Sequence, residues 1–276
     1  RSPVSGFVEE QGRIVGVTLD DGQTLRARLT IAADGRSSIS RALLPLEDLG
    51  APMDVFWFRI AKSGTDKAGL RGNVERGRLL VMIDRGDYWQ CAFLIPKGAA
   101  EAYQARGIEA IRAEVAAAAP ADLDLAELDE ITDLHLLTVK LDRLTCWQRP
   151  GLLAIGDAAH AMSPIGGIGI NLAVQDAVAA ANFIAGPLSR GDAVDPLLHK
   201  VQGRRLFPTR VIQAAQKAAQ DNVIGRLLQT GAPITKAPLI VWLLDRFPLL
   251  RRIPGRLIGL GIRRERVRSP AAPVRS

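Results

Sequence analysis

The distribution of apolar and polar residues predicts a short buried strand, a glycine-rich loop and a helix near the middle of the chain. Leu152–Ile155 is apolar throughout, which is typical of a strand buried on both faces of a parallel sheet. Asp157 follows directly, at the strand end where open α/β sheets hold their ligands. From Asn171 onward apolar residues recur at helical spacing. The loop between them carries little bulk, with Pro164, Gly166, Gly167 and Gly169.

This arrangement favours a ligand that carries negative charge. The unpaired N–H groups at the start of the predicted helix point back into the loop, and a helix N-terminus attracts anions. The local alternative is an ordinary strand–helix connection in which Asp157 is only a cap. The GGIGIN run is no dinucleotide fingerprint, because Leu172 stands where the third glycine belongs.

Strand patterns also occupy the start of the chain. Arg13–Leu19 and Thr24–Ile31 flank Asp20-Asp21-Gly22, which predicts a hairpin. The chain then continues as IAADGRSSISRALL, in which an apolar strand is followed by Asp-Gly and a short predicted helix. Ser37 or Ser38 is suited to cap this helix. Read locally, Asp34 is a turn former.

The segment between these two regions predicts an antiparallel sheet followed by a helix. Its strands are rich in β-branched and aromatic residues, and residues 84–87 join the last two as a hairpin. The predicted strands are Asp54–Ile60, Arg78–Ile83 and Tyr88–Ile95. Alanine content predicts one helix over Glu101–Ala119, ended by Pro120. Further on, Asp192–Leu228 is predicted to be mostly helical, with a bend at Pro208.

Strand alternation separates the side chains of the first of these strands into two faces. Val55, Trp57 and Arg59 share one face, while Phe56, Phe58 and Ile60 share the other. The pattern leaves open which face meets a ligand. Arg59 is the best candidate for binding a carboxylate, and a surface salt bridge is an equally good interpretation.

Composition indicates a globular protein of about two domains. The chain has 276 residues, 47% hydrophobic and 24% charged, enough for a sizeable core. Two cysteines form no disulfide framework, no signal peptide is visible and no uncharged apolar run of spanning length occurs, so we expect a cytoplasmic protein. Three histidines without a ligand spacing predict no metal site, and His160 is expected to have a structural hydrogen-bonding role.

The net charge of +7 is concentrated toward the C-terminus, where arginines interleave with apolar residues. A solvated basic face on packed helices is the favoured interpretation, and weak association with an anionic membrane surface is the alternative. Pro248 and Pro254 are expected to interrupt a long amphipathic helix. No nucleic-acid-binding module or aromatic stacking pattern accompanies these residues, which excludes that class of partner. They are Arg246, Arg251, Arg252, Arg256, Arg263, Arg264, Arg266 and Arg268.

Two motifs together resemble the class A FAD-dependent monooxygenases, the para-hydroxybenzoate-hydroxylase-like aromatic hydroxylases. GDAAHAMSPIGGIGINLAVQDA is similar to their second flavin fingerprint, and IAADGRSSISRALL, about 120 residues earlier, resembles their DG motif. The resemblance implies that Asp157 holds the ribityl chain of FAD and that Pro164 lies beside the flavin ring, near the substrate. It further implies cofactor-binding roles for Gly166, Gly167, Gly169, Ile170 and Asn171, the last three through backbone N–H groups. Asp34 and Gly35 would lie near the pyrophosphate, and Arg41 would hold the motif and the passing nicotinamide.

The resemblance implies a fold as well. We expect an α/β, Rossmann-like three-layer FAD-binding domain with an inserted, mainly antiparallel substrate domain and C-terminal helices. The expected parts are 1–49 and 150–190 for the FAD-binding domain, 50–149 for the substrate domain and 191–276 for the helical region. The family opens with a G-x-G-x-x-G strand–turn–helix that this sequence lacks, and position 1 is Arg. We therefore expect an incomplete chain that binds FAD poorly alone.

The implied activity is hydroxylation of an aromatic or similarly activated small molecule, with NADPH or NADH as reductant and O₂ as oxidant. The cofactor carries the chemistry, so no side chain is assigned as a catalytic acid or base. Trp57 and Arg59, besides Pro164, are the candidate substrate contacts. A flavin reductase or halogenase of the same fold is one alternative, although Cys91–Pro96 lacks the tryptophans typical of those relatives. A truncated, non-catalytic remnant or binding module is the other.

Overall fold

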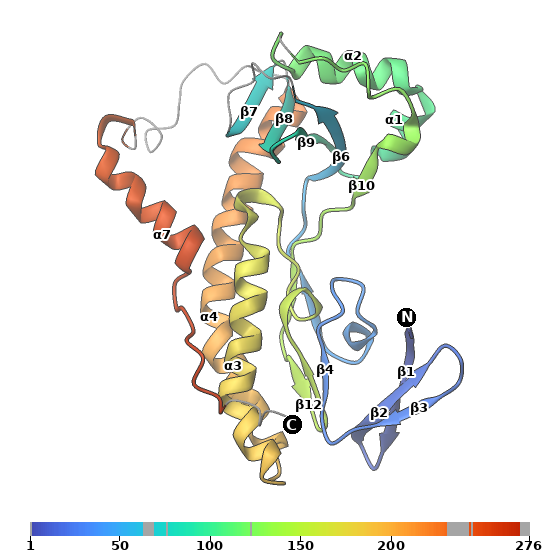
Figure 1. Ribbon diagram of the computed structural model, residues 1–276, viewed down its shortest axis with the longest axis vertical. Helices are drawn as coiled ribbons and strands as arrows, with labels where there is room; N and C mark the ends of the chain where they lie inside the picture. Colours follow the sequence, from blue (N-terminus) through green and yellow to red (C-terminus); the bar gives the residue numbers. More distant parts are fainter. Residues whose placement is uncertain are drawn as a thin grey trace. The chain divides into compact units, whose positions relative to one another are not determined.

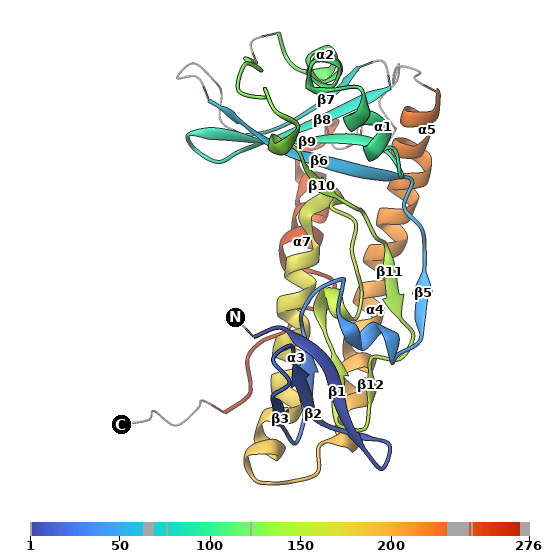
Figure 2. The ribbon, with the colours of Figure 1, turned by 90° about the vertical axis from the view of Figure 1, so that its right-hand side faces the viewer.

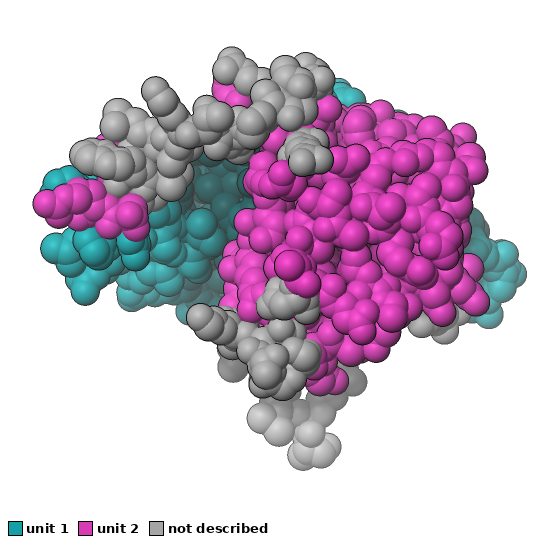
Figure 3. Space-filling view, turned by 90° about the horizontal axis from the view of Figure 1, so that it is seen from above, with its two compact units in different colours: residues 1–50, 140–216, 247–276 teal, residues 51–139, 217–246 magenta. Residues whose placement is uncertain are grey.

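The computed structural model describes residues 2–62, 69–75, 77–121, 123–230, 243 and 245–270. The chain forms two compact units, coloured teal and magenta in Figure 3. Unit 1 comprises residues 1–50, 140–216 and 247–276, and unit 2 comprises residues 51–139 and 217–246. Each motif singled out for flavin binding lies in unit 1, whereas the predicted antiparallel strands lie in unit 2.

Unit 1 begins with a three-stranded antiparallel sheet. Its central strand β2 pairs with both neighbours, and the predicted hairpin across Asp20–Gly22 is confirmed by the pairing of Thr18 with Thr24. The first strand was not expected from the pattern. The strands are β1 (Val4–Glu10), β2 (Arg13–Leu19) and β3 (Thr24–Arg26).

The predicted buried strand is confirmed as β13 (Leu152–Ala154), whose three residues are all buried. It pairs in parallel with β4 (Thr30–Ala32) and antiparallel with β12 (Gln148–Arg149). A further antiparallel pair joins β11 (Asp142–Leu144) to β5 (Leu46–Asp48). Among the described residues β4 and β13 form the only parallel pair, so the parallel sheet expected for the FAD-binding domain is represented by these two strands.

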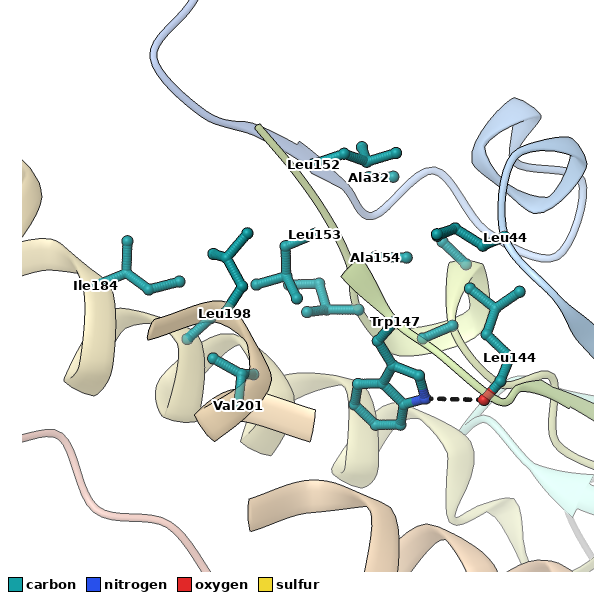
Figure 4. Packing of buried hydrophobic residues seen from close by; sticks show 14 of the residues in the cluster. Ala32, Leu44, Leu144, Trp147, Leu152, Leu153, Ala154, Ile184, Leu198 and Val201 are labelled. Carbon is teal, nitrogen blue, oxygen red and sulfur yellow. Dashed lines mark hydrogen bonds between the residues drawn. The ribbon is translucent and has the colours of Figure 1, made fainter. Parts of the chain in front are cut away.

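The core of unit 1 packs around β13. Leu152, Leu153 and Ala154 belong to one buried cluster with Ile184 of α3 and with Leu198 and Val201 of α4, and Figure 4 shows Leu153 on the side of the helices. Trp147 is fully buried beside them, and its Nε1–H donates to the Leu144 carbonyl at 3.2 Å. The buried indole therefore keeps its one donor satisfied.

Two long helices cover this core and lie side by side in Figures 1 and 2. α3 (Gly169–Ser189) begins at the last glycine of the loop, as predicted, and α4 (Asp195–Ala219) continues through buried Pro208. The bend expected at Pro208 stays a prediction, and a π-helical segment at Gln220–Ile224 precedes α5 (Gly225–Thr230). Near the C-terminus Pro248–Arg251 forms a 3-10 turn and Arg252–Leu260 forms α7. Pro248 opens the 3-10 turn and Pro254 lies in the first turn of α7, where a missing N–H is tolerated. Residues 247–270 contain no helix longer than the nine residues of α7, as the two prolines predict.

By length and apolar composition, the stretch Ile165–Ser189 passes as a membrane-spanning helix. Its Asp176 is fully buried and bonded to other side chains of unit 1, and Ala179, Ala180 and Ile184 belong to the core. Both features are typical of the core helix of a folded domain.

Unit 2 is built on a five-stranded antiparallel sheet in the order β10-β6-β9-β8-β7. All three predicted strands are confirmed, as β6 (Met53–Ala61), β8 (Arg78–Asp84) and β9 (Tyr88–Pro96), and the predicted hairpin joins the last two. The edge strands β7 (Leu70–Glu75) and β10 (His135–Leu137) were not predicted.

The single helix predicted over Glu101–Ala119 was wrong in one respect. The structure has two helices, α1 (Ala100–Ala105) and α2 (Ile108–Ala118), separated at Gly107. Gly107 has φ +80°, a backbone conformation that glycine adopts without strain and that ends a helix. A 3-10 turn at Ile131–Asp133 then leads into β10.

These helices decide which face of the sheet is covered within unit 2. Phe56, Phe58 and Ile60 form a core with Ile111 and Val115 of α2. Trp57 and Arg59 lie on the opposite face, where Trp57 is partly buried and Arg59 is exposed. The structure thus shows which face of β6 packs on the helices, and which face meets a ligand stays a prediction.

Candidate functional site

The two predicted flavin motifs meet at the carboxyl ends of the parallel strands of unit 1. Asp34, Gly35 and Arg36 follow β4, and Asp157 lies in the 3-10 turn Gly156–Ala158 that follows β13. The Arg36 guanidinium lies 3.2 Å from the Asp157 carboxylate, and the two side chains keep 28% and 31% of their surface exposed. The structure thus brings together two motifs about 120 residues apart and leaves a carboxylate accessible at their junction.

Glycines allow the turn to lie close to the start of α3. Gly156 has φ +59°, and a Cβ there would lie 3.0 Å from the Cβ of Ala173. A Cβ on Gly169 would lie 4.0 Å from Oδ1 of Asp157. The predicted carboxylate and the first residue of α3 are therefore neighbours.

The start of α3 is open to a ligand. Its N-cap is Ile168, which makes no side-chain capping bond, and the N–H groups of Gly169, Ile170 and Asn171 have no acceptor within the helix. Pro164 begins the preceding 3-10 turn Ile165–Gly167, in which Gly167 has φ +61° and no atom within 4 Å of the position of an added Cβ. Bare backbone, uncapped N–H groups and a nearby carboxylate suit a flat, polar group with negative character, so these residues fit FAD.

Arg41 ties the two motifs together from within. Its guanidinium makes a two-pronged ion pair with Asp142 at 2.8 and 2.9 Å, and also donates to the carbonyls of Asp157 and Ala158. Its side chain is 9% exposed. This geometry supports the expected role of holding the motif. These bonds use four of the five guanidinium N–H donors, and contact with a nicotinamide stays a prediction.

A buried ionic cluster, which sequence reasoning did not predict, holds the turn that carries Asp157. Asp176 of α3 accepts from the Gly156 N–H at 3.1 Å, from Nε2 of His160 at 2.6 Å and from Nε of Arg205 at 2.9 Å. Asp176, His160 and Arg205 are all fully buried. His160 thus has the structural environment expected for it. We refer to these three side chains as the Asp176 cluster.

Buried glutamines of α4 hold the loop on its other side. Gln216 accepts from the Ser163 N–H at 3.2 Å and donates to the carbonyls of Ser163 and Ile165 at 2.9 Å each. Gln213 donates to the carbonyls of Asp142 and Ala161. The peptide groups on both sides of Pro164 are therefore fixed by a side chain more than 50 residues later in the chain.

The DG segment has a defined turn. Ser38 accepts from the Ser40 N–H and caps the 3-10 helix Ile39–Ala42, which confirms one of the two predicted caps. Gly35 has φ +90°, as the turn requires. Asp34 is exposed beside it and available to a ligand.

The candidate substrate residues lie in unit 2. The Arg59 guanidinium stacks over the Tyr88 ring at 3.9 Å, and within the part of the chain that the structure describes it pairs with no carboxylate. The surface salt bridge considered for Arg59 is therefore not found there. Trp57 lies in one row across the sheet with Ala92, Val81 and Gly72. Its direct neighbours in this row are the small residue Ala92 on β9 and His135 on β10.

Several of the C-terminal arginines are exposed and have exposed apolar side chains beside them in α7. Arg252 and Arg256 of α7 are exposed, as are Leu257, Ile258 and Leu260 in part. Arg263 instead stacks over the ring of Phe207 at 5.2 Å. Weak membrane-surface association through this region stays a prediction.

Comparison with known proteins identifies the family. The model of the family described as FAD binding domain matches residues 4–215. The 6-methylpretetramide 4-monooxygenase of Streptomyces rimosus is 33% identical over 274 residues, which cover 96% of this chain and 64% of that protein. The chain spans less than two thirds of the length of the curated relatives it matches, with 64%, 41% and 51% covered.

Solved structures share the fold. PqsL, a probable FAD-dependent monooxygenase from Pseudomonas aeruginosa, superposes with a TM-score of 0.66 at 22% identity, covering 83% of this chain and 66% of that chain. HpxO from Klebsiella pneumoniae, solved with FAD and uric acid, gives a TM-score of 0.68 at 19% identity, covering 92% and 64%. Because the family model matches most of the chain, including both motifs at the site, the chain belongs to the FAD binding domain family.

Proposed function

We propose that the protein to which this chain belongs is an FAD-dependent monooxygenase that hydroxylates an aromatic small molecule, with NADPH or NADH as reductant and O₂ as oxidant. One observation carries the proposal. An accessible carboxylate, Asp157, lies beside an uncapped helix start and a bare glycine loop, at the carboxyl ends of two parallel strands. That is where α/β proteins of this kind hold a cofactor.

Bound FAD would supply the redox chemistry that side chains cannot provide. The chain's own residues bind and orient it. The Asp157 carboxylate would accept hydrogen bonds from ribityl hydroxyls, and the N–H groups of Gly169, Ile170 and Asn171 would favour negative charge on the ring edge. Asp34 and Gly35 serve the pyrophosphate side. Arg41 and the Asp176 cluster keep both segments in place.

The substrate contacts are assigned to the face of the unit 2 sheet that lies opposite α2, where Trp57 is partly buried and Arg59 is exposed. Trp57 offers a flat aromatic surface beside the small residue Ala92, and Arg59 offers a cation without a carboxylate partner among the described residues. A planar ring that carries a carboxylate or a phenolate satisfies both. Pro164 is the contact proposed for the flavin-binding unit.

The relatives support this substrate class. One is a monooxygenase named for 6-methylpretetramide, and CabE, with a TM-score of 0.68 at 22% identity, is described as an aromatic hydroxylase. A flavin reductase or halogenase of the same fold, and a non-catalytic binding module, are the competing functions. Flavin retention separates the module from the enzymes, and the identity of the product separates a hydroxylase from the other two.

The test uses the whole protein and two matched pairs of variants. Asp157→Ala should weaken FAD affinity about 10- to 100-fold, because a hydrogen bond to a charged group contributes about 1.5–3 kcal/mol. Asp192→Ala, which removes an exposed carboxylate, is its control. Affinity is measured by titrating FAD-free protein and following flavin fluorescence. Unchanged affinity in Asp157→Ala would refute the assigned role.

The second pair tests the substrate face. Arg59→Ala should raise KM for a carboxylate-bearing aromatic substrate at least about tenfold, while leaving FAD affinity and KM for a neutral analogue unchanged. Arg85→Ala removes an exposed guanidinium from the hairpin between β8 and β9. It should change neither the KM for either substrate nor the FAD affinity. NAD(P)H oxidation without any oxygenated product would contradict the monooxygenase assignment.

A further inference from the structure

The last residues of α7 and the segment after it contact the start of α3, the loop before it and α4. We call residues 258–269 the C-terminal strap. After α7 ends, this segment runs along α3 and α4, as Figure 1 shows, and all of its described contacts stay within unit 1. It lies beyond residues 4–215, the part matched by the family model.

The strap first contacts the start of α3 and the loop before it. Asn171 donates from Nδ2 to the Ile258 carbonyl at 2.9 Å. Ile262 packs against a small cluster that contains Met162, Ile168 and Leu172. Ile168 is the residue immediately before α3, so the strap supports the backbone whose N–H groups face the proposed cofactor.

Its middle part reaches the turn of Asp157 through the Asp176 cluster. Arg205 donates from Nη1 to the Arg263 carbonyl at 2.8 Å and from Nε to Asp176 at 2.9 Å. Asp176 in turn accepts the Gly156 N–H. Glu265 lies with its carboxylate 3.7 Å from Nη1 of Arg205, and its side chain is only 3% exposed. A continuous chain of charge-assisted bonds therefore connects the strap with the residue next to Asp157.

The last part of the strap is hydrogen-bonded to one side chain of α3. Asn182 donates from Nδ2 to the Arg266 carbonyl at 2.9 Å, and its Oδ1 accepts from the N–H groups of Arg268 and Ser269 at 2.7 and 3.0 Å. Three backbone groups of a segment without regular secondary structure are thus satisfied by one amide.

We propose that the C-terminal strap positions the flavin-binding turn and the start of α3, so that tight FAD binding depends on contacts made by residues 258–269. The inference rests on the proposed function in that FAD is the ligand. A loop in which four glycines lie within 14 residues has many backbone conformations, and contacts on its far side reduce the number that it samples. Ile262, Arg205 and Asn182 are positioning residues, since each acts on the site through another residue.

The experiment compares Ile262→Ala and Asn182→Ala with the wild type in the whole protein. Each should weaken FAD affinity about three- to tenfold, where tenfold corresponds to about 1.4 kcal/mol. In FAD-free protein, amide hydrogen exchange should become faster in residues 156–171 and stay unchanged in the sheet of unit 2. The control is Arg210→Ala, which removes an exposed charge from α4 that makes none of the strap contacts, and it should match the wild type.

Each outcome decides the inference. Weaker FAD binding together with faster exchange confined to residues 156–171 supports it. Wild-type FAD affinity and exchange in both folded variants would overturn it, as would faster exchange spread evenly over both units, which indicates general destabilisation. If one variant does not fold, the other decides. If the wild type itself binds no FAD, the proposed function fails, and the exchange of residues 156–171 alone still tests the strap.

Discussion

The turn of unit 1 that is proposed to bind flavin and the sheet of unit 2 are stabilised by different means. Around the turn, Asp176, His160 and Arg205 are fully buried and bonded to one another, and Gln213 and Gln216 fix the neighbouring loop. The sheet of unit 2 has a continuous antiparallel ladder of nine paired positions between β6 and β9. Its covered face is packed with apolar side chains such as Phe56 and Leu80.

The difference follows from what each backbone can do for itself. Strands satisfy their peptide groups in the ladder, so their side chains are free to form an apolar core. A loop that must keep N–H groups open for a ligand has no ladder. Its remaining peptide groups need partners from side chains, and buried charges need one another. The functional end of unit 1 is therefore held by polar groups, and mutations should affect the two regions in different ways.

The largest effect is expected at the centre of the Asp176 cluster. Asp176→Ala removes the carboxylate 2.9 Å from Nε of the buried Arg205 and leaves only Glu265, at 3.7 Å, and breaking such a buried pair costs about 3–5 kcal/mol of unfolding free energy. FAD affinity should fall as well, because the Gly156 N–H loses its acceptor. Urea unfolding and flavin titration of the same sample measure both. Asp192→Ala is the control and should change stability by less than about 1 kcal/mol, and an equally small loss in Asp176→Ala would contradict the cluster's importance.

In unit 2 the corresponding test is a substitution in the apolar core of the sheet. Leu80→Ala removes a fully buried side chain and should cost about 2–5 kcal/mol, without changing the FAD affinity of protein that remains folded. Leu80→Met keeps the volume and should cost less than about 1.5 kcal/mol. Urea denaturation measures both. A large loss of FAD affinity in Leu80→Ala at a temperature where the protein is folded would show that the two regions are not separable.

Gln216 tests the polar support of the loop on a smaller scale. Gln216→Ala leaves the peptide groups of Ser163 and Ile165 without their side-chain partner, and each buried group left unpaired costs about 1–3 kcal/mol. Because these groups flank Pro164, FAD affinity should fall together with stability. Gln23→Ala, which truncates an exposed side chain in the hairpin between β2 and β3, provides the matched control. Loss of stability with unchanged FAD affinity would show that the loop does not depend on this glutamine for its binding geometry.

The same contrast explains what the sequence predicts and what it does not. Strand alternation and the apolar run at Leu152 are local patterns, and β6, β8, β9 and β13 are found where those patterns place them. Asp157, Asp34 and the glycines are identifiable because they sit in compact motifs. Local patterns failed where one residue decided the backbone, as at Gly107 between α1 and α2.

The residues that support the site are spread along the chain and carry no local signal. Asp142 lies about 100 residues after Arg41, and Arg205 lies 29 residues after Asp176. In a helix pattern, a buried Asp, Arg or Gln looks like any exposed polar position. One signal was available for Asp176, since it falls between Leu172 and Ala180 on the apolar face of α3, where an unpaired carboxylate is unfavourable.

The smallest effect is expected at the main buried carboxylate of unit 2, and it depends on pH. Burial by itself raises the pKa of the Asp54 carboxyl, but hydrogen bonds from Lys97 and from the N–H groups of Gly98 and Val139 outweigh it, so the pKa lies below its ordinary value. A carboxyl whose pKa is lower in the folded state stabilises the fold above its unfolded pKa of about 3.9. This stabilisation is lost as the pH falls through the folded pKa.

The wild type should therefore lose on the order of 1 kcal/mol more unfolding free energy than Asp54→Asn when the pH is lowered from about 6 to about 3. The neutral amide cannot titrate, so its contribution does not change over this range. Asp87→Asn, at an exposed position of the β8–β9 hairpin, should show the pH dependence of the wild type. FAD affinity at neutral pH should be unchanged in both variants, in contrast to Asp176→Ala. If Asp54→Asn lost flavin as readily as Asp176→Ala, a polar group of the sheet would be as important to the site as the buried charges of unit 1, and the distinction between the two regions would fail.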